Sequence, residues 1–396
     1  MKKNIYPLVI NPFRNKDLFS AIKSIRTGNL TTGNQINKFE NIFSKKLKLK
    51  KALMVNSGSS ANLLAVQCII NPYRKKRILS GDEVLIPTIC WSTSLWPIVQ
   101  SGLKPVFVDI DPMTLNIDLQ DLRKKINKKT KAMMLVHVLG NSANMDELMK
   151  IIKKEKIILI EDTCESLGSK YKDKYLGSFG DFSSYSFYSS HQISSGEGGM
   201  ITCKSTEDYE ILKALRSHGW SRGLKNENQI SKQNKKLDSR FIFYNSGFNL
   251  RSTEVSATLG ISQFRDMDKL NNLRTVNRAM IIKAMLKNKK INKNLTFIEA
   301  NKFVKPSWFG IPIIVKNKNK KKQLIKNLET QGIETRPIIS GNFLRQPAIK
   351  KYKLDKGVKF KNADTINDQG FFIGLHPKKL NELLLNKIVK IFEQSL

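Results

Sequence analysis

The chain has 396 residues, of which 40% are hydrophobic and 26% are charged, a composition that excludes a disordered or fibrous protein. The formal net charge of +36 suggests nucleic-acid binding. The lysines are, however, spread over the whole chain without the aromatic neighbours of RNA-binding surfaces, so we expect no nucleic-acid partner. No apolar run is long enough for a bilayer and no secretory leader is evident, which predicts a cytoplasmic protein without a membrane partner.

The first half of the chain alternates short apolar runs with helical patterns. Helices are expected between the runs, for example at 60–70 and 145–154. This alternation is typical of βαβ units and predicts an α/β fold with a largely parallel sheet, whose functional residues lie at the carboxyl ends of the strands. The expected strands are 51–55, 83–86, 104–108, 132–137, 156–161, 182–187 and 199–203.

The second half has a different organisation. Residues 224–238 are polar and lysine-rich and predict a long loop, and residues 253–286 predict a long helix or a helix pair. Beyond them, the chain has its own pattern of strands and helices. We therefore expect a large α/β domain with an N-terminal arm at 1–265 and a smaller α+β domain at 266–396.

A loop rich in serine, residues 57–60, follows the first strand and opens a helix. Backbone N–H groups at a helix N-terminus bind phosphate, Gly58 lets the backbone come close, and the hydroxyl of Ser59 adds a donor. An ordinary helix cap built from serine and asparagine is the alternative. The loop thus predicts a candidate phosphate site.

Other candidate residues also follow strands. Asp162 ends a buried apolar run, and Trp91 follows the strand at 83–86. Asp162 is either a ligand-binding carboxylate or the cap of the next helix, and Trp91 is either a stacking partner or a core residue. The run from Ser186 to Gly199 contains His191, a side chain that moves protons near neutral pH.

Several of these motifs, in this order, resemble the DegT/DnrJ/EryC1/StrS family of sugar aminotransferases, which use pyridoxal phosphate. The resemblance implies the fold-type I, aspartate aminotransferase-like architecture, with a mostly parallel seven-stranded sheet and a smaller C-terminal domain. It implies that Asp162 binds the pyridinium nitrogen and that Asn249 reaches the cofactor of a neighbouring subunit in a homodimer. The implied cofactor-binding residues are Gly58, Ser59, Trp91, Asp162, Ser186 and Asn249. Arg251, Arg336 and His218 are candidates for substrate binding, with a surface salt bridge as the equal alternative for Arg336 and a structural role as the alternative for His218.

His191 stands where most members of the family carry the lysine that forms a Schiff base with the cofactor. The small subgroup with this exchange consists of nucleotide-sugar 3-dehydratases. The resemblance therefore implies that pyridoxal or pyridoxamine 5'-phosphate and His191, as acid and base, remove the C3 hydroxyl of a nucleotide-diphosphate 4-keto-6-deoxy sugar. Glutamate is the implied amino donor.

Three alternatives remain at this stage. The missing lysine disfavours an ordinary nucleotide-sugar aminotransferase. The four cysteines are scattered and have no metal-ligand spacing, which disfavours an iron–sulfur dehydratase and any other metal site. The joint presence of Asp162, the loop at 57–60 and His191 disfavours a cofactor-binding protein without activity.

Overall fold

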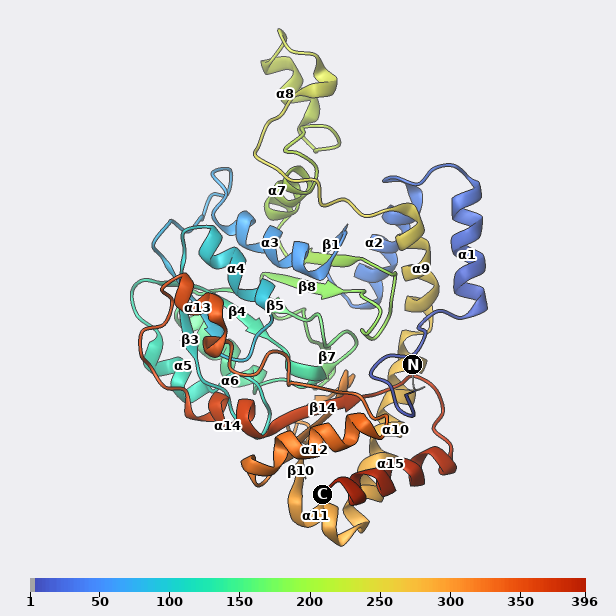
Figure 1. The fold of residues 1–396 in the computed structure, drawn as a ribbon. Helices are drawn as coiled ribbons and strands as arrows, with labels where there is room; N and C mark the ends of the chain where they lie inside the picture. Colours follow the sequence, from blue (N-terminus) through green and yellow to red (C-terminus); the bar gives the residue numbers. More distant parts are fainter. Residues whose placement is uncertain (1–3) are drawn as a thin grey trace.

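A computed structural model describes residues 4–396. Its centre is a seven-stranded sheet in the order β1-β9-β8-β5-β4-β2-β3 (Figure 1). The pairs β2–β3, β2–β4, β4–β5 and β5–β8 are parallel, whereas β9 pairs antiparallel with β1 and β8. The strands are β1 (Lys51–Val55), β2 (Glu83–Pro87), β3 (Lys104–Val108), β4 (Thr130–Val136), β5 (Ile158–Asp162), β8 (Phe182–Ser186) and β9 (Gly199–Cys203).

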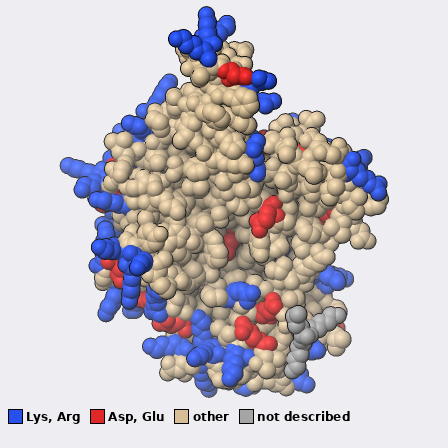
Figure 2. All heavy atoms as spheres, turned by 45° about the horizontal axis from the view of Figure 1, so that its top comes forward, with Lys and Arg blue, Asp and Glu red and all other residues tan. Residues whose placement is uncertain are grey.

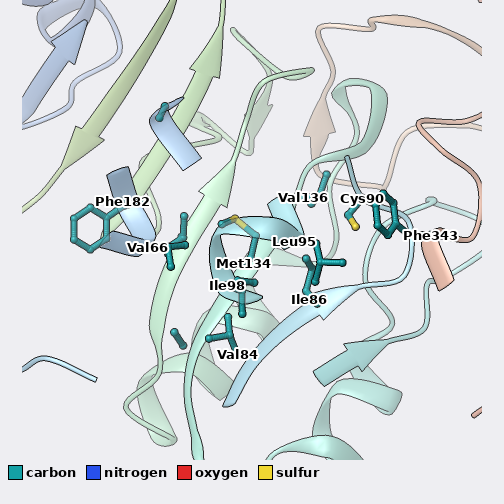
Figure 3. Close-up of a cluster of buried hydrophobic side chains, with 14 of the residues drawn as sticks. Val66, Val84, Ile86, Cys90, Leu95, Ile98, Met134, Val136, Phe182 and Phe343 are labelled. Carbon is teal, nitrogen blue, oxygen red and sulfur yellow. The ribbon is translucent and has the colours of Figure 1, made fainter. Parts of the chain in front are cut away.

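Both faces of this sheet are buried. Alternate residues along each strand point to opposite faces, so neighbouring residues pack into different clusters. Met134 packs into one hydrophobic cluster, part of which Figure 3 shows, and its neighbour Met133 packs into another. Helices cover the two faces. They include α3 (Gly58–Ile69), α4 (Ser92–Gln100), α5 (Leu119–Lys125), α6 (Met145–Lys154) and α7 (Thr206–Arg216).

The N-terminal part packs against a later helix. Helices α1 (Asn15–Arg26) and α2 (Asn34–Lys46) both contact α9 (Glu254–Arg265), which is followed by the long α10 (Met267–Lys287). The predicted helix pair at 253–286 is therefore confirmed. The expected loop at 224–238 is wrong in part, since it contains α8 (Glu227–Gln233) on an arm that projects from the molecule (Figure 1).

The C-terminal part forms a second, antiparallel sheet in the order β10-β12-β14-β13. We propose that the boundary between the two parts falls at 265/266, between α9 and α10, as expected. The elements here are α11 (Lys289–Asn294), β10 (Leu295–Phe297), β12 (Gly310–Val315), α12 (Lys318–Thr330), β13 (Thr335–Arg336), α13 (Pro347–Lys351), α14 (Lys361–Gln369), β14 (Gly370–Gly374) and α15 (Glu382–Ser395).

A small three-stranded sheet, β11-β6-β7, connects the two parts. Its strands are β6 (Lys170–Tyr171), β7 (Lys174–Tyr175) and β11 (Val304–Lys305). Within residues 4–396, no helix is long and apolar enough to cross a membrane, and no three His, Cys, Asp or Glu side chains are grouped so as to hold a metal ion.

Candidate active site

The N-terminus of α3 lies against the carboxyl end of β8. The hydroxyl of Ser57 caps the helix by accepting a hydrogen bond from the Ser60 amide at 3.1 Å. A Cβ atom at Gly58 would stand 2.7 Å from the Ser186 Cβ and 2.7 Å from the Cys164 Sγ. Glycine is therefore required at this position, and the predicted residues Gly58 and Ser186 are neighbours in space.

The N-terminus of α4 joins the same site. The Ser59 and Thr93 hydroxyls are hydrogen-bonded at 2.9 Å, which connects the first turns of α3 and α4. Trp91, the residue before α4, is 57% exposed and so is not the core tryptophan of the alternative interpretation. The N-termini of α3 and α4, which carry partial positive charge, therefore lie side by side, and this arrangement favours binding of an anion between them.

Asp162, at the end of β5, is only 5% exposed. Its Oδ2 accepts hydrogen bonds from Asn62 Nδ2 at 2.8 Å and from the Ser94 hydroxyl at 2.7 Å. Its Oδ1 accepts one from the backbone amide of Cys164 at 3.2 Å. Three donors, from α3, α4 and the residues directly after β5, thus orient this carboxylate. The donors Asn62 and Ser94 were not among the predicted site residues, although Asn62 belongs to the same serine-rich motif.

Cys164 connects His191 to Asp162, because its backbone amide bonds Asp162 and its carbonyl oxygen bonds His191. Its Nδ1 lies 2.7 Å from the carbonyl oxygen of Cys164, and because a carbonyl only accepts, Nδ1 carries the proton. Nε2 of the neutral ring is then the acceptor. Burial lowers the pKa of His191 to about 4, with a smaller lowering from the charge of Arg274. The imidazole is therefore neutral at pH 7 and ready to take a proton at Nε2.

Glu165 is a titratable residue near this site that the sequence reasoning missed. Burial raises its pKa to about 7, and Oε2 accepts a hydrogen bond from the Leu139 amide at 2.9 Å. Its backbone oxygen accepts a further bond from the side chain of Gln192, the residue after His191. The only sequence signal was its place in the run that follows β5.

The remaining predicted residues lie in other places. Arg251, Asn249 and His218 form one cluster. Nε of Arg251 donates a hydrogen bond to Oδ1 of Asn249 at 3.0 Å, and Nη2 of Arg251 lies 3.3 Å from Nε2 of His218. This cluster adjoins the serine-rich loop, since the Asn56 amide donates to the oxygen of Leu250 at 3.0 Å. Arg336 is exposed on β13, where it bonds the oxygen of the preceding residue. No hydrogen bond or ion pair within residues 4–396 joins it to the other predicted site residues.

The fold and the arrangement of these side chains define an enzyme of the pyridoxal phosphate-dependent, aspartate aminotransferase-like class, as predicted. The DegT/DnrJ/EryC1/StrS aminotransferase family model matches residues 13–392, and the chain belongs to this family. The GDP-4-keto-6-deoxy-D-mannose 3-dehydratase of Escherichia coli O55:H7 is 36% identical over 383 residues, which are 95% of this chain and 96% of that relative.

Two solved structures show the same likeness. E. coli GDP-4-keto-6-deoxy-D-mannose-3-dehydratase with bound hydrated pyridoxal phosphate is 34% identical, with a TM-score of 0.90, covering 98% of this chain and 100% of that one. A GDP-4-keto-6-deoxymannose-3-dehydratase with a trapped adduct of pyridoxal phosphate and glutamate is 33% identical, with a TM-score of 0.89 and the same coverage.

The residues of this chain fit pyridoxal phosphate. The first turn of α3 offers backbone N–H groups and hydroxyls to a phosphate, and Asp162 offers a carboxylate to a protonated ring nitrogen. The exposed indole of Trp91 can lie on a ring. The buried Oδ1 of Asn62 has no partner among the described residues, which leaves an acceptor open beside Asp162. The individual roles of these residues are predictions.

Proposed function

We propose that the protein is a pyridoxal phosphate-dependent 3-dehydratase that removes the C3 oxygen of a GDP-linked 4-keto-6-deoxy sugar. The observation that carries this proposal is His191, which cannot form a Schiff base and holds an unprotonated Nε2 in a site that otherwise fits the cofactor. The named activity of the 3-dehydratase relatives supports the substrate. The product is the 4-keto-3,6-dideoxy sugar.

The cofactor supplies an amine for the C4 ketone of the sugar and a ring that accepts electrons. The protein supplies binding and proton transfer. The first turn of α3 holds the phosphate, Asp162 holds the ring nitrogen, and Trp91 covers the ring. Nε2 of His191 takes a proton from the methylene carbon that bears the amino group of the cofactor. It then gives this proton to the C3 oxygen of the sugar, which leaves as water.

The overall reaction balances with glutamate. Replacing the C3 hydroxyl by hydrogen is a two-electron reduction, and glutamate provides these electrons when it is oxidised to 2-oxoglutarate and its nitrogen is released as ammonia. The structure with a trapped glutamate adduct supports glutamate as the donor. We further propose a homodimer and a cytoplasmic location. The four free cysteines support the latter, because thiols persist in a reducing compartment.

The decisive experiment measures release of the C3 oxygen from GDP-4-keto-6-deoxymannose with glutamate present. His191→Asn should slow this release by roughly 10²–10⁴, because the acid–base group is lost. Cofactor binding should change little, since the phosphate, ring and nitrogen contacts belong to other residues. If His191→Asn releases the oxygen as fast as the wild type, the proposed role of His191 is wrong.

A lysine variant distinguishes dehydration from amine transfer. After borohydride reduction, wild-type protein should carry no cofactor on the peptide around residue 191, because imidazole has no primary amine. His191→Lys should become labelled there and lose dehydration. Wild-type protein that is labelled at this peptide, or that forms an amino sugar as its main product, would support the aminotransferase alternative instead.

A further inference from the structure

A cavity of about 200 Å³ lies beside His191 and has no role in the mechanism above. The N-terminal arm, the loop that carries His191, helix α10 and the segment after β14 form its walls. Because a single water needs only roughly 10–15 Å³, the space admits a small organic molecule. Within residues 4–396, its lining includes Arg14, Arg274 and Lys378 and contains no Asp or Glu. Because Arg14 pairs with Asp17 and Asp266, the cations of the lining that have no ion pair within residues 4–396 are Arg274 and Lys378, and these favour an anion in the cavity.

Arg274 is the central charge of this cavity. It is 6% exposed, and its Nη2 donates to the oxygen of His191 at 3.0 Å. Its Nε has no hydrogen-bond partner in the described part of the chain, and no ion pair there includes it. Burying a cation without a counter-charge costs several kcal/mol. Tyr6, which lies nearby, does not supply the negative charge, because burial raises its pKa far above neutrality.

Arg278, which is also buried, and two half-buried arginines differ from Arg274 because each pairs with a carboxylate of the protein. Arg278, one turn further along α10, is 8% exposed and pairs with Glu299 at 3.3 Å. Arg74 pairs with Asp208 at 2.7 Å, and Arg216 pairs with Glu40 at 2.9 Å. These arginines each have a carboxylate of the protein as partner. Arg274 lines a cavity and has no protein carboxylate as partner within residues 4–396, which suits a residue that pairs with the carboxylate of a bound ligand.

We propose that Arg274 binds a carboxylate of the amino donor glutamate in this cavity. This inference rests on the proposed function for the identity of the donor. A guanidinium binds a carboxylate through two parallel hydrogen bonds, and the apolar walls around it, which include Phe309 and Phe372, suit the methylene groups of glutamate. The ring of Phe309 lies 5.1 Å from that of His191, so the cavity adjoins the reacting groups. A nucleotide diphosphate is too large for it.

The test uses the cofactor-loaded enzyme and compares Arg274→Met with Arg278→Met. Arg274→Met should raise the KM for glutamate and the Kd for glutarate, a dicarboxylate without an amine, by about 10- to 100-fold, as expected for a lost charged hydrogen-bond pair. The KM for the sugar should stay within about twofold, because a different set of contacts holds it. Arg278→Met should change neither constant. Unchanged glutarate binding in Arg274→Met overturns the proposal.

A wild-type measurement keeps the test decisive if Arg274→Met does not fold. Glutarate should raise the melting temperature of the wild type, whereas glutaramide, which has the same length and no charge, should not. Equal shifts, or no shift with glutarate, overturn the carboxylate site. If glutarate binding depends on Arg274 but no C3 oxygen is released from the sugar, the carboxylate site stands and the proposed 3-dehydratase function fails.

Discussion

Two titratable residues lie on either side of Cys164, His191 bonded to its carbonyl oxygen and Glu165 next to it in the chain, and burial shifts their pKa values in opposite directions. The pKa of His191 is lowered to about 4, and that of Glu165 is raised to about 7. Burial disfavours the charged form of each, which is the cationic form of the histidine and the anionic form of the glutamate. The protein thus keeps a neutral base at His191 and, one residue after Cys164, an acid that changes its charge near physiological pH; perturbed groups of this kind are typical of catalytic sites.

Glu165 should make stability depend on pH. Its folded-state pKa of about 7 exceeds the ordinary value of 4.5, so its stabilising contribution is complete below pH about 4.5 and is lost as the pH rises through about 7. Glu165→Gln removes this dependence. Relative to the variant, the wild type should lose about 1–3 kcal/mol of unfolding free energy between pH 5 and pH 8, measured by urea denaturation. The exposed Glu155→Gln serves as control, and parallel pH curves for wild type and Glu165→Gln would contradict the prediction.

At the scale of the elements, the sequence predicted the large sheet well. The expected bounds of β1, β3 and β9 agree with the structure, because continuous apolar runs between turn residues mark buried strands. Helix α8 was missed for a physical reason. It has seven residues with only Ile230 buried, and that residue packs with Leu224 and Ile242 from outside the helix. No local periodicity reveals a helix that has a single buried residue and whose packing partners lie outside it.

The contact between α3 and β8 yields a prediction about Gly58. A methyl group there would overlap the side chains of Ser186 and Cys164, so Gly58→Ala must displace the first turn of α3, at a cost of about 1–3 kcal/mol. Affinity for pyridoxal phosphate, followed by its absorbance, should fall about tenfold or more, because the N–H groups of this turn move. The double variant Gly58→Ala/Cys164→Ala should recover part of the affinity. Wild-type affinity in Gly58→Ala would show that this turn does not hold the phosphate.

At the scale of the molecule, the sequence predicted the members of the site better than their partners. Gly58, Asp162 and His191 were proposed because each lies at or after the end of a strand in a recognisable motif, and the structure places all three around Cys164, while their roles stay predictions. Ser94 and Arg274 were not, because the contacts that give them meaning join segments 68 and 83 residues apart. Which donors meet a carboxylate, and which cation lacks one, are properties of the packed chain and not of local pattern.

The high net charge also has to be judged on the whole molecule. Figure 2 shows Lys and Arg side chains scattered over one face, at its projections and flanks, with wide uncharged areas between them. On that face they do not gather into a continuous stripe such as a nucleic-acid backbone requires. The distribution agrees with the even spread of lysine along the chain.

The site should be completed by a second subunit. Asn249 is exposed, and its side-chain nitrogen, Nδ2, has no hydrogen-bond partner within residues 4–396. This group is therefore free to contact a neighbouring subunit. The next residue, Leu250, accepts a hydrogen bond from the Asn56 amide, so Asn249 is also near enough to the serine-rich loop to act within its own chain. Mixing inactive His191→Asn with inactive Asn249→Ala subunits distinguishes the two arrangements.

If Asn249 acts across the interface, each mixed dimer contains one site with both His191 and a partner's Asn249, because the two defects fall in the same other site. Random mixing should then restore about a quarter of the wild-type rate of C3 oxygen release, since about half of the dimers are mixed. A mixture of His191→Asn with His191→Lys is the control and should restore none. An inactive mixture of His191→Asn and Asn249→Ala, with mixed dimers verified by mass spectrometry, would place Asn249 in the site of its own chain.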